Sequence, residues 1–135
     1  MANEVEPDGI SRTHDKLYDA AYYKNYDQGG YNRDEEWLSF FSNIADKIVN
    51  KLSPKTAVDM GCAFGILVEA LRDRGVDAHG IDISDYAVSC GRQDIKPFLS
   101  VGSILQPIKN RYDLVICIEV IEHLKEEDTR TAIQN

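Results

Sequence analysis

The stretch Ala57-Val58-Asp59-Met60-Gly61-Cys62-Ala63-Phe64-Gly65-Ile66-Leu67 decides the fold of this chain. A β-prone apolar run ends in an acid, a tight turn with two glycines follows, and apolar residues then recur at helical spacing. Strand, glycine-rich turn and helix together form a ligand site at the carboxyl end of a parallel strand. The glycines let the backbone approach a ligand where a Cβ would collide, and the helix amides point toward the ligand's polar end.

The spacing of the glycines separates two kinds of ligand. A dinucleotide site needs Gly-x-Gly-x-x-Gly, and read from Gly61 that pattern would require glycines where the chain has Ala63 and Ile66. Asp59 precedes Gly61 by two residues, and its carboxylate attracts an ammonium group but not a pyrophosphate. The spacing therefore argues against a nicotinamide-dependent oxidoreductase. An ordinary strand–helix turn, with glycines for geometry only, remains the other interpretation of this segment.

These residues resemble the first motif of the class I, Rossmann-like S-adenosylmethionine-dependent methyltransferases, Asp/Glu-x-Gly-x-Gly-x-Gly, with Ala63 in place of the middle glycine. The resemblance implies an α/β fold, a three-layer α/β/α sandwich with a mostly parallel sheet, and S-adenosyl-L-methionine as the cofactor. It implies that Asp59 and the backbone at Gly61 orient the methionine ammonium. It also implies that Gly65 leaves space for the methionyl part, and that Cys62 and Ala63 belong to the same binding turn.

A second strand is expected over residues 76–83, with Asp82 at its tip about twenty residues past the glycine turn. An acid at this place can accept hydrogen bonds from both ribose hydroxyls. Ile83 beside it offers an apolar face for adenine. Ser84 is expected to be the N-cap of a following helix.

A third strand is expected over residues 97–101, where Pro97 is tolerated as the first residue. Members of the resembling family often carry Gly-Asp after this strand, and the carboxylate receives the adenine amine. This chain has Gly102 followed by Ser103 instead. The resemblance therefore implies that Ser103 and the backbone at Ile104 enclose adenine with a weaker hydrogen bond.

A fourth strand is expected from the apolar run 114–118, which suits a parallel strand covered on both faces. The following residues 119–124, Glu-Val-Ile-Glu-His-Leu, resemble the fourth motif of family members that act on small molecules, lipids or glycans. The resemblance implies that Glu119 borders both the methionyl group and the acceptor cavity. His123 is a candidate general base, and a purely structural histidine at a helix start is the alternative.

The same segment has a spacing that binds a divalent metal in some relatives. Glu119, Glu122 and His123 can converge if a helix begins at the first of them. The string also occurs in family members that bind no metal, and no metal is predicted here.

The N-terminal part is expected to form a separate unit. Residues 1–33 combine a polar segment with a tyrosine-rich lid helix, and residues 34–135 form the S-adenosylmethionine-binding domain. The tyrosines either pack on the domain at i, i+4 steps or form a mobile lid with its hinge at Gly29 and Gly30. A helix is expected over residues 34–52, with a core-facing stripe of Trp37, Phe40, Phe41, Ile44, Ile48 and Leu52.

Charge and composition limit the partners. The net charge of −8 on 135 residues disfavours nucleic acids. Cys62, Cys90 and Cys117 cannot all pair, which indicates reduced thiols and a cytoplasmic protein. No apolar run approaches the length of a membrane span.

The sequence ends within a predicted helix soon after the fourth strand, whereas the family's sheet has seven strands. The domain is therefore expected to be incomplete at its C-terminus, with an exposed sheet edge that favours self-association. The predicted function is an S-adenosylmethionine-dependent methyltransferase with a small-molecule, lipid or sugar acceptor. The alternative is a truncated, non-catalytic S-adenosylmethionine-binding or assembly module.

Overall fold

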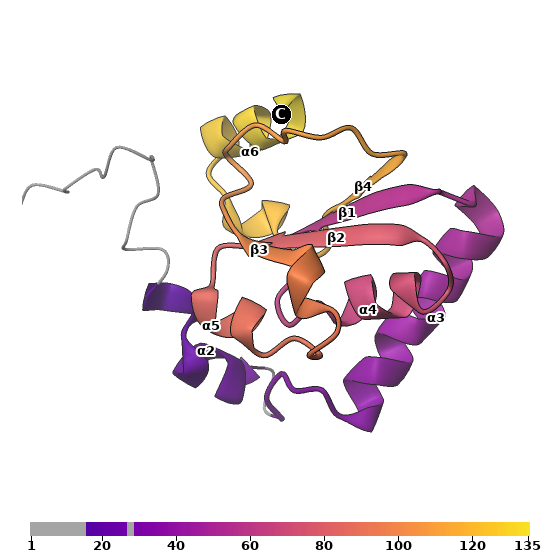
Figure 1. Ribbon diagram of the computed structural model, residues 1–135. Coiled ribbons are helices and arrows are strands. Elements are labelled where there is room, and N and C mark those ends of the chain that lie inside the picture. The colour runs from indigo at the N-terminus through magenta and orange to yellow at the C-terminus, as the bar shows by residue number, and fades with distance from the viewer. Residues whose placement is uncertain (1–15, 27–28) are drawn as a thin grey trace, which may run out of the picture.

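The computed structural model describes residues 16–26 and 29–135, so the predictions for residues 1–15 lie outside it. The elements in chain order are η1 (Lys16–Tyr18), α2 (Ala20–Lys24), α3 (Glu35–Leu52), β1 (Thr56–Met60), α4 (Ile66–Arg72), β2 (Asp77–Asp82), α5 (Asp85–Ser89), η3 (Lys96–Phe98), β3 (Leu99–Val101), β4 (Leu114–Ile116), η4 (Ile121–His123) and α6 (Glu126–Gln134). Helices lie between β1 and β2 and between β2 and β3, as in a parallel α/β architecture, whereas a loop without a helix leads from β3 to β4 (Figure 1).

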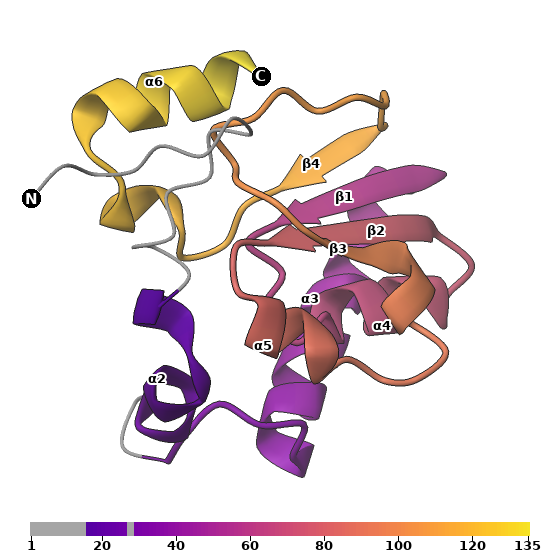
Figure 2. The ribbon, with the colours of Figure 1, turned by 60° about the vertical axis from the view of Figure 1, so that its left-hand side comes forward.

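The four strands form one parallel sheet in the order β3-β2-β1-β4. The first three strands are added in one direction across the sheet, and β4 is then added on the other side of β1, so that β1 lies between β2 and β4. Because all strands are parallel, their carboxyl ends meet at one edge, beside α5 and η4 (Figure 2). The predicted Rossmann-like α/β fold is confirmed, and this edge is where such folds bind ligands.

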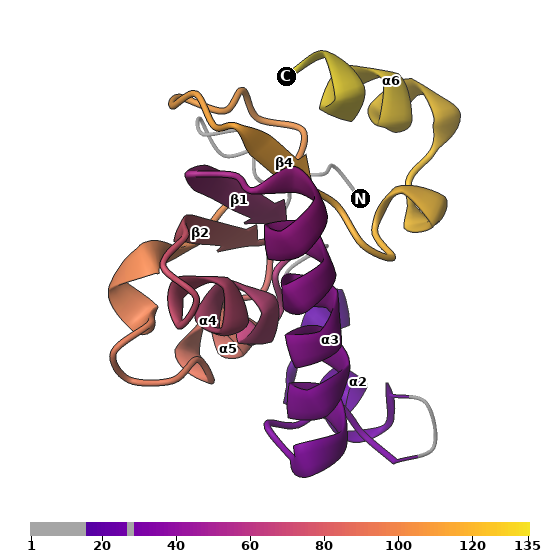
Figure 3. The same cartoon turned by 90° about the vertical axis from the view of Figure 1, so that its right-hand side faces the viewer.

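Different helices lie on the two sides of the sheet, and only one face is well covered. α3 and α4 pack on one face, where Ala45, Leu67 and Leu71 form a core with Ala57 and Ala78 of the strands. α6 lies beyond β4, on the opposite side from α3, α4 and α5 (Figure 3). Helices therefore lie on both sides of the sheet, as predicted, and the larger part of the core lies under α3 and α4.

The long helix α3 agrees with the predicted range. Its N-cap is Asp34, whose carboxylate accepts a hydrogen bond from Trp37 N at 3.0 Å. The core-facing stripe is only partly correct, because Phe40 and Leu52 are 48% and 61% exposed. Phe40 precedes Phe41 by one residue, and two consecutive helical positions cannot both face the sheet. Leu52 is the last residue of the helix.

The third strand is shorter than predicted. Lys96–Phe98 form the 3-10 helix η3, and only Leu99–Val101 pair with β2. Pro97 suits the start of a short helix because its φ is preset and it has no N–H to donate. Phe98 packs instead beneath the guanidinium of Arg72, 3.3 Å from its ring centroid.

The fourth strand is also shorter, and it is covered less than expected. β4 includes Leu114–Ile116, so Cys117 and Ile118 lie past its end. Val115 is 53% exposed, which contradicts the expectation that both faces are covered. Within the part of the chain that the structure describes, β4 pairs with β1 only and is an edge strand.

None of the helices within residues 16–26 and 29–135 combines the length and the apolar character needed to cross a bilayer.

Candidate cofactor-binding site

The turn after β1 runs through three left-handed residues. Gly61, Ala63 and Gly65 have φ of 85°, 48° and 72°. A Cβ on Gly61 would lie 2.3 Å from Cγ2 of Val120, so this close approach requires glycine. Ala63 adopts the left-handed conformation with a side chain, at a cost of about 1–2 kcal/mol. The turn therefore keeps the geometry of the three-glycine motif although its middle glycine is absent.

Asp82 holds this turn against the tip of β2. Its Oδ2 accepts a hydrogen bond from Ala63 N at 2.7 Å, and its Oδ1 accepts one from Ser84 N at 2.9 Å. Burial raises the pKa of Asp82, while the amides of Ser84 and Ala63 act in the opposite direction. The sequence predicted the place of Asp82 but not this contact with the turn, which offsets the strain at Ala63.

Ser84 is the N-cap of α5, as predicted, since its hydroxyl accepts a hydrogen bond from Ala87 N at 3.1 Å. The same hydroxyl donates to the carbonyl of Tyr18 at 2.5 Å. It thereby joins the tip of β2 to the tyrosine-rich segment, residues 18–31.

Asp59 at the end of β1 is a buried carboxylate with no partner on the described side chains. It is 5% exposed, and no amide or side chain among residues 16–26 and 29–135 donates a hydrogen bond to its carboxylate. Burial, together with the charge of Asp82, raises the pKa of Asp59 to about 7. A buried carboxyl group of this kind is costly unless a hydrogen-bonding or cationic group meets it. The position is therefore suited to an ammonium group of a ligand.

Cys62 of the turn has a packing role. It is 4% exposed, and its Sγ lies 2.7 Å from the place that a Cβ on Gly80 would take, so β2 approaches the turn closely. Burial and the neighbouring Asp59 raise the pKa of its thiol well above the ordinary value. A thiol that stays protonated is a poor nucleophile.

The residues predicted around adenine lie beside the tip of β2. Gly102 N donates to the carbonyl of Asp82 at 2.9 Å, which brings the loop after β3 to this edge. Ile83, Ser103 and Ile104 are partly exposed. The hydroxyl of Ser103 accepts a hydrogen bond from Leu105 N at 3.1 Å within its own turn.

Glu119 lies past β4 in a left-handed conformation, with φ of 53°. Its Oε2 accepts a hydrogen bond from the hydroxyl of Tyr26 at 3.0 Å. Since η4 begins only at Ile121, Glu119 is not on a helix with Glu122 and His123, and the geometry considered for a metal does not form. No group of three His, Cys, Asp or Glu side chains converges on one point in the described residues. His123 is exposed on η4.

The tyrosine-rich segment is not one helix, contrary to the prediction. Asp19 caps α2 through its carboxylate and separates it from η1, and α2 ends at Lys24, before Tyr26. The rings still contact one another, with centroids 4.9 Å apart for Tyr18–Tyr22 and 5.8 Å for Tyr22–Tyr26. The Asp19 carboxylate accepts the hydrogen bond of Tyr22 N in place of a backbone carbonyl, so a new helix begins there and the pattern is interrupted.

Two buried tyrosines of this segment cover the glycine turn. Tyr23 and Tyr31 are 6% and 7% exposed, and their rings lie 5.1 and 4.9 Å from that of Phe64. The sequence pattern did not predict this contact, although Phe64, an aromatic residue within the turn, was a sign that other rings pack there. The tyrosine-rich segment therefore forms one wall of the site.

The site is acidic. Burial first, and then the neighbouring Asp59, raises the pKa of Tyr31. Burial likewise raises the pKa of Tyr22, with contributions from Asp82 and Glu119. The phenols stay neutral and the carboxylates provide the charge, so the site favours a cationic ligand.

Comparison with known proteins identifies the family. A family model described as "Methyltransferase domain" matches residues 30–135. The chain belongs to this methyltransferase family. The matched range begins at Gly30, within the tyrosine-rich segment, and it includes β1, β2 and β4 with their tips.

Curated relatives of this methyltransferase domain are named ubiquinone biosynthesis O-methyltransferases. The protein from Nitrosomonas europaea is 35% identical, over 69% of this chain and 42% of the relative. The protein from Acinetobacter baumannii strain AYE is 33% identical, over 61% of this chain and 38% of the relative. The matches thus span less than half the length of these relatives.

Solved structures share the fold of the domain. Magnesium protoporphyrin IX methyltransferase from Synechocystis, with bound S-adenosylmethionine, aligns with a TM-score of 0.60 and 24% identity over 72% of this chain and 51% of that chain. The PH0226 protein from Pyrococcus horikoshii aligns with a TM-score of 0.65 and 20% identity over 76% and 52%.

Proposed function

We propose that the chain binds S-adenosyl-L-methionine at the glycine turn and that the protein transfers its methyl group to a hydroxyl of a small-molecule acceptor. The observation that carries this proposal is Asp59, a buried carboxylate without a partner on the described side chains, beside a turn that a Cβ at Gly61 would obstruct. An amino-acid ammonium supplies the missing partner. A nicotinamide dinucleotide has no such group.

The residues at the sheet edge fit the parts of this cofactor. Asp59 holds the ammonium, and the backbone at Gly61 and Gly65 leaves room for the methionyl chain. Asp82 uses one lone pair of each oxygen on a backbone amide and keeps others for the ribose hydroxyls. Ile83, Ser103 and Ile104 then border adenine at the neighbouring loop. When bound, S-adenosylmethionine supplies an electrophilic methyl group on a cationic sulfonium.

The chain's own contribution to transfer is positioning and proton handling. Holding the acceptor oxygen in line with the methyl group provides a proximity advantage that reaches on the order of 7–11 kcal/mol. Glu119 borders the acceptor side of the site, and His123 is the candidate base for the acceptor proton. The choice of a hydroxyl acceptor is supported by the name O-methyltransferase that the curated relatives carry.

In this proposal the chain divides into an N-terminal unit, residues 1–33, and the binding domain, residues 34–135. The tyrosine-rich segment of the N-terminal unit acts as a lid. Gly30 supports the hinge, since its φ is 79° and its N–H donates to the carbonyl of Tyr26 at 2.7 Å. Tyr22 and Tyr26 lie near Glu119, where their faces can meet a sulfonium.

Two further parts of the proposal concern the molecule as a whole. The exposed edge of β4, with Val115 53% exposed, pairs with a second copy of the chain. Cys62, Cys90 and Cys117 are all free, which supports a cytoplasmic location. Sedimentation at increasing protein concentration tests the pairing of two copies through β4. A monomer at all concentrations would contradict it.

Calorimetric titration with S-adenosylmethionine, S-adenosylhomocysteine and NADH tests the cofactor. We expect both adenosyl compounds to bind and NADH not to bind. Binding of NADH alone would contradict the proposal.

Methyl transfer needs a separate experiment, because the matches cover less than half of the curated relatives. A single-turnover assay with labelled donor and a set of small phenols tests it. Donor binding without transfer to any acceptor would favour the alternative, a non-catalytic S-adenosylmethionine-binding module.

A further inference from the structure

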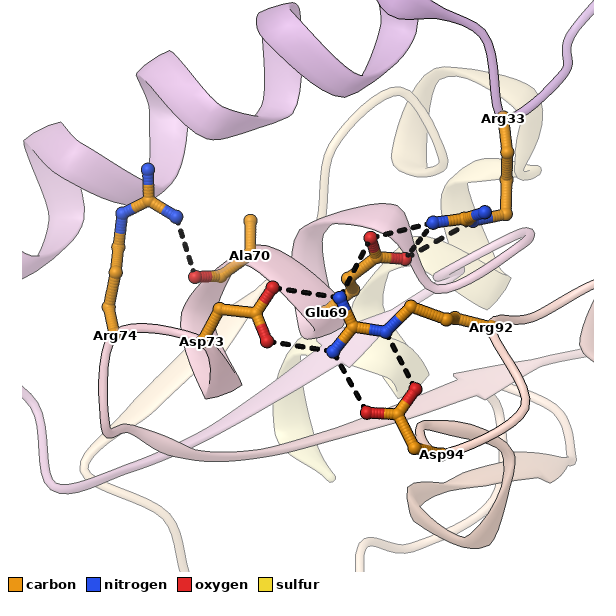
Figure 4. Close-up of polar contacts among 7 residues, drawn as sticks. All are labelled: Arg33, Glu69, Ala70, Asp73, Arg74, Arg92 and Asp94. Atoms are coloured by element: carbon orange, nitrogen blue, oxygen red, sulfur yellow. Dashed lines mark hydrogen bonds and ion pairs between the residues drawn. The ribbon is translucent and has the colours of Figure 1, made fainter.

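A carboxylate of α4 lies between two arginines from distant parts of the chain. Only 9% of the Glu69 side chain is exposed. Arg33 NH2 lies 2.7 Å from Glu69 Oε1 and 2.8 Å from Oε2, and Arg33 Nε lies 3.2 Å from Oε2. Arg92 NH1 lies 3.2 Å from Oε1 on the other side (Figure 4).

Arg92 is itself held by two other carboxylates. Its guanidinium contacts Asp73 through NH1 and NH2 at 2.8 and 2.7 Å, and Asp94 through Nε and NH2 at 2.7 and 3.0 Å. These contacts orient Arg92 independently of Glu69. A nearly buried carboxylate with two charged donors is well compensated, and removal of either donor leaves part of its charge unpaired.

The three residues come from three separate parts of the chain: Glu69 lies on α4, and the two arginines lie in the connections before α3 and after α5. Glu69 lies on the helix that follows the glycine turn. Arg92 follows α5, the helix whose N-cap Ser84 is bonded to Asp82. Arg33 lies between the tyrosine-rich segment and α3. The Glu69 carboxylate therefore joins α4, the connection after α5 and the chain just after the tyrosine-rich segment.

A short chain of contacts leads from Arg33 to the turn itself. Tyr31, two residues earlier, has its ring centroid 4.8 Å from that of Trp37 and 4.9 Å from that of Phe64. Trp37 Nε1 donates to the carbonyl of Gly30 at 3.1 Å. Arg33 is therefore two residues along the chain from the ring that contacts the turn.

We propose that Arg33 and Glu69 are positioning residues for donor binding. They fix the base of the tyrosine-rich segment on α4, so that Tyr31 lies against the glycine turn before the donor arrives. Neither side chain needs to touch the donor. This inference rests on the proposed function, since it concerns the affinity for S-adenosylmethionine.

The test variant is Arg33→Met, which keeps an aliphatic side chain and removes the guanidinium group that binds Glu69. We expect the Kd for both S-adenosylmethionine and S-adenosylhomocysteine to rise about tenfold, the scale of a modest coupling between two sites. Trp37 is the single tryptophan of the chain, and its emission should shift as its contact with Tyr31 loosens. Arg33→Lys keeps the charge but not the bidentate geometry, so its loss of affinity should be smaller.

Arg74 offers a matched control. Arg74 follows α4 and donates to the carbonyl of Ala70 at 2.8 Å (Figure 4). Its Nε pairs with Asp46 Oδ1 at 2.8 Å and its NH2 with Ser42 Oγ at 2.7 Å, which joins the end of α4 to α3. Arg74→Met should lower the denaturation midpoint like Arg33→Met while leaving the donor Kd unchanged. Glu69→Gln is the second test variant if Arg33→Met does not fold.

The outcomes separate the two proposals. If the wild-type chain binds neither adenosyl compound, the proposed function fails, and the inference fails with it. If the wild type binds and both Arg33→Met and Glu69→Gln bind equally well, only the positioning role is overturned. Equal losses of affinity in Arg33→Met and Arg74→Met would also overturn it, because they would reflect a general loss of stability.

Discussion

β1 has a different neighbour on each side, and the ends of these neighbours are built differently. β2 pairs along β1 from Thr56–Asp77 to Met60–Ile81 and ends at Asp82, whose two oxygens are bonded to backbone amides. β4 pairs only from Ala57–Leu114 to Asp59–Ile116. Its tip leads to Glu119, which is exposed, has a left-handed backbone and accepts a hydrogen bond from Tyr26.

The apolar packing follows the same division. The β2 side is covered by α4 and α5, with Leu67, Leu71 and Ala87 almost fully buried. The β4 side leaves Val115 and Ile133 53% and 71% exposed, and a cavity of about 420 Å³ lies between β4, η4 and α6. The β2 side is therefore organised by its own contacts, whereas the β4 side has apolar surface left for further contacts.

The largest expected effect is at Gly61, where the two sides touch. Gly61→Ala should cost about 2–5 kcal/mol of unfolding free energy. The alanine would have to keep the positive φ of Gly61, and its Cβ would collide with Val120 of the β4 side. Denaturant unfolding measures this cost.

Gly75→Ala is the matched control for Gly61→Ala, since Gly75 has φ of 84° and open space around the Cβ position. It should cost only the backbone penalty of about 1–2 kcal/mol. Adding Val120→Ala to Gly61→Ala should recover part of the loss. Equal losses of unfolding free energy at both glycines would mean that a Cβ on Gly61 does not collide with Val120.

The next effect is a pH dependence of stability from Asp59, of the order of a few kcal/mol at most. Its pKa is raised to about 7 in the folded, ligand-free chain, against about 3.9 when unfolded. Between these values the folded state holds the extra proton, so the unfolding free energy falls as pH rises from about 4 to about 7. Asp59→Asn should flatten this slope in pH-dependent unfolding curves. The same slope in both proteins would show that Asp59 ionises freely.

A smaller effect is expected on donor binding. Asp59→Asn removes a charge-assisted contact to the ammonium and should weaken binding by about 1.5–3 kcal/mol. In the wild type, affinity should rise with pH up to about 7 as the proton leaves Asp59. Titration calorimetry at several pH values measures both.

Asp46→Asn is the control for this variant, because Asp46 is exposed and pairs with Arg74. It should leave the donor Kd unchanged. A donor Kd that is the same in Asp59→Asn and wild type would place the ammonium elsewhere.

The smallest effect is expected at the β4 tip. Tyr26→Phe removes a hydrogen bond of 3.0 Å to an exposed carboxylate, which should change the donor affinity by about 0.5–1 kcal/mol. Tyr112→Phe, on a ring that packs near His79, should have no effect on binding. A tenfold or larger loss in Tyr26→Phe would show that the β4 tip is as tightly organised as the β2 tip.

Local sequence pattern was enough to predict much of the β2 side. The order of strand, glycine turn and helix, the acid at the tip of the second strand, the Ser84 cap and the helix beginning after Asp34 were all confirmed. Each depends on residues within a few positions of one another, and such contacts form in most compact folds of the chain.

Strand ends and helix continuity were predicted less well. The pattern placed Pro97 in a strand and Tyr18 to Tyr26 on one helix, while the structure has a 3-10 helix and a capped break. In both cases a side chain competes with the regular backbone pattern, proline through its missing donor and aspartate through its carboxylate.

By itself, the sequence determined the parallel α/β class, the position of the glycine turn and the acids at the ends of β1 and β2. Only the tertiary structure decided which of these acids has a backbone partner, that Glu69 joins Arg33 to Arg92, and that Tyr26 reaches Glu119. The physical reason is the separation along the chain over which each kind of interaction acts. Propensity and periodicity act between neighbours in the chain, whereas hydrogen bonds and ion pairs between distant residues depend on how the elements pack.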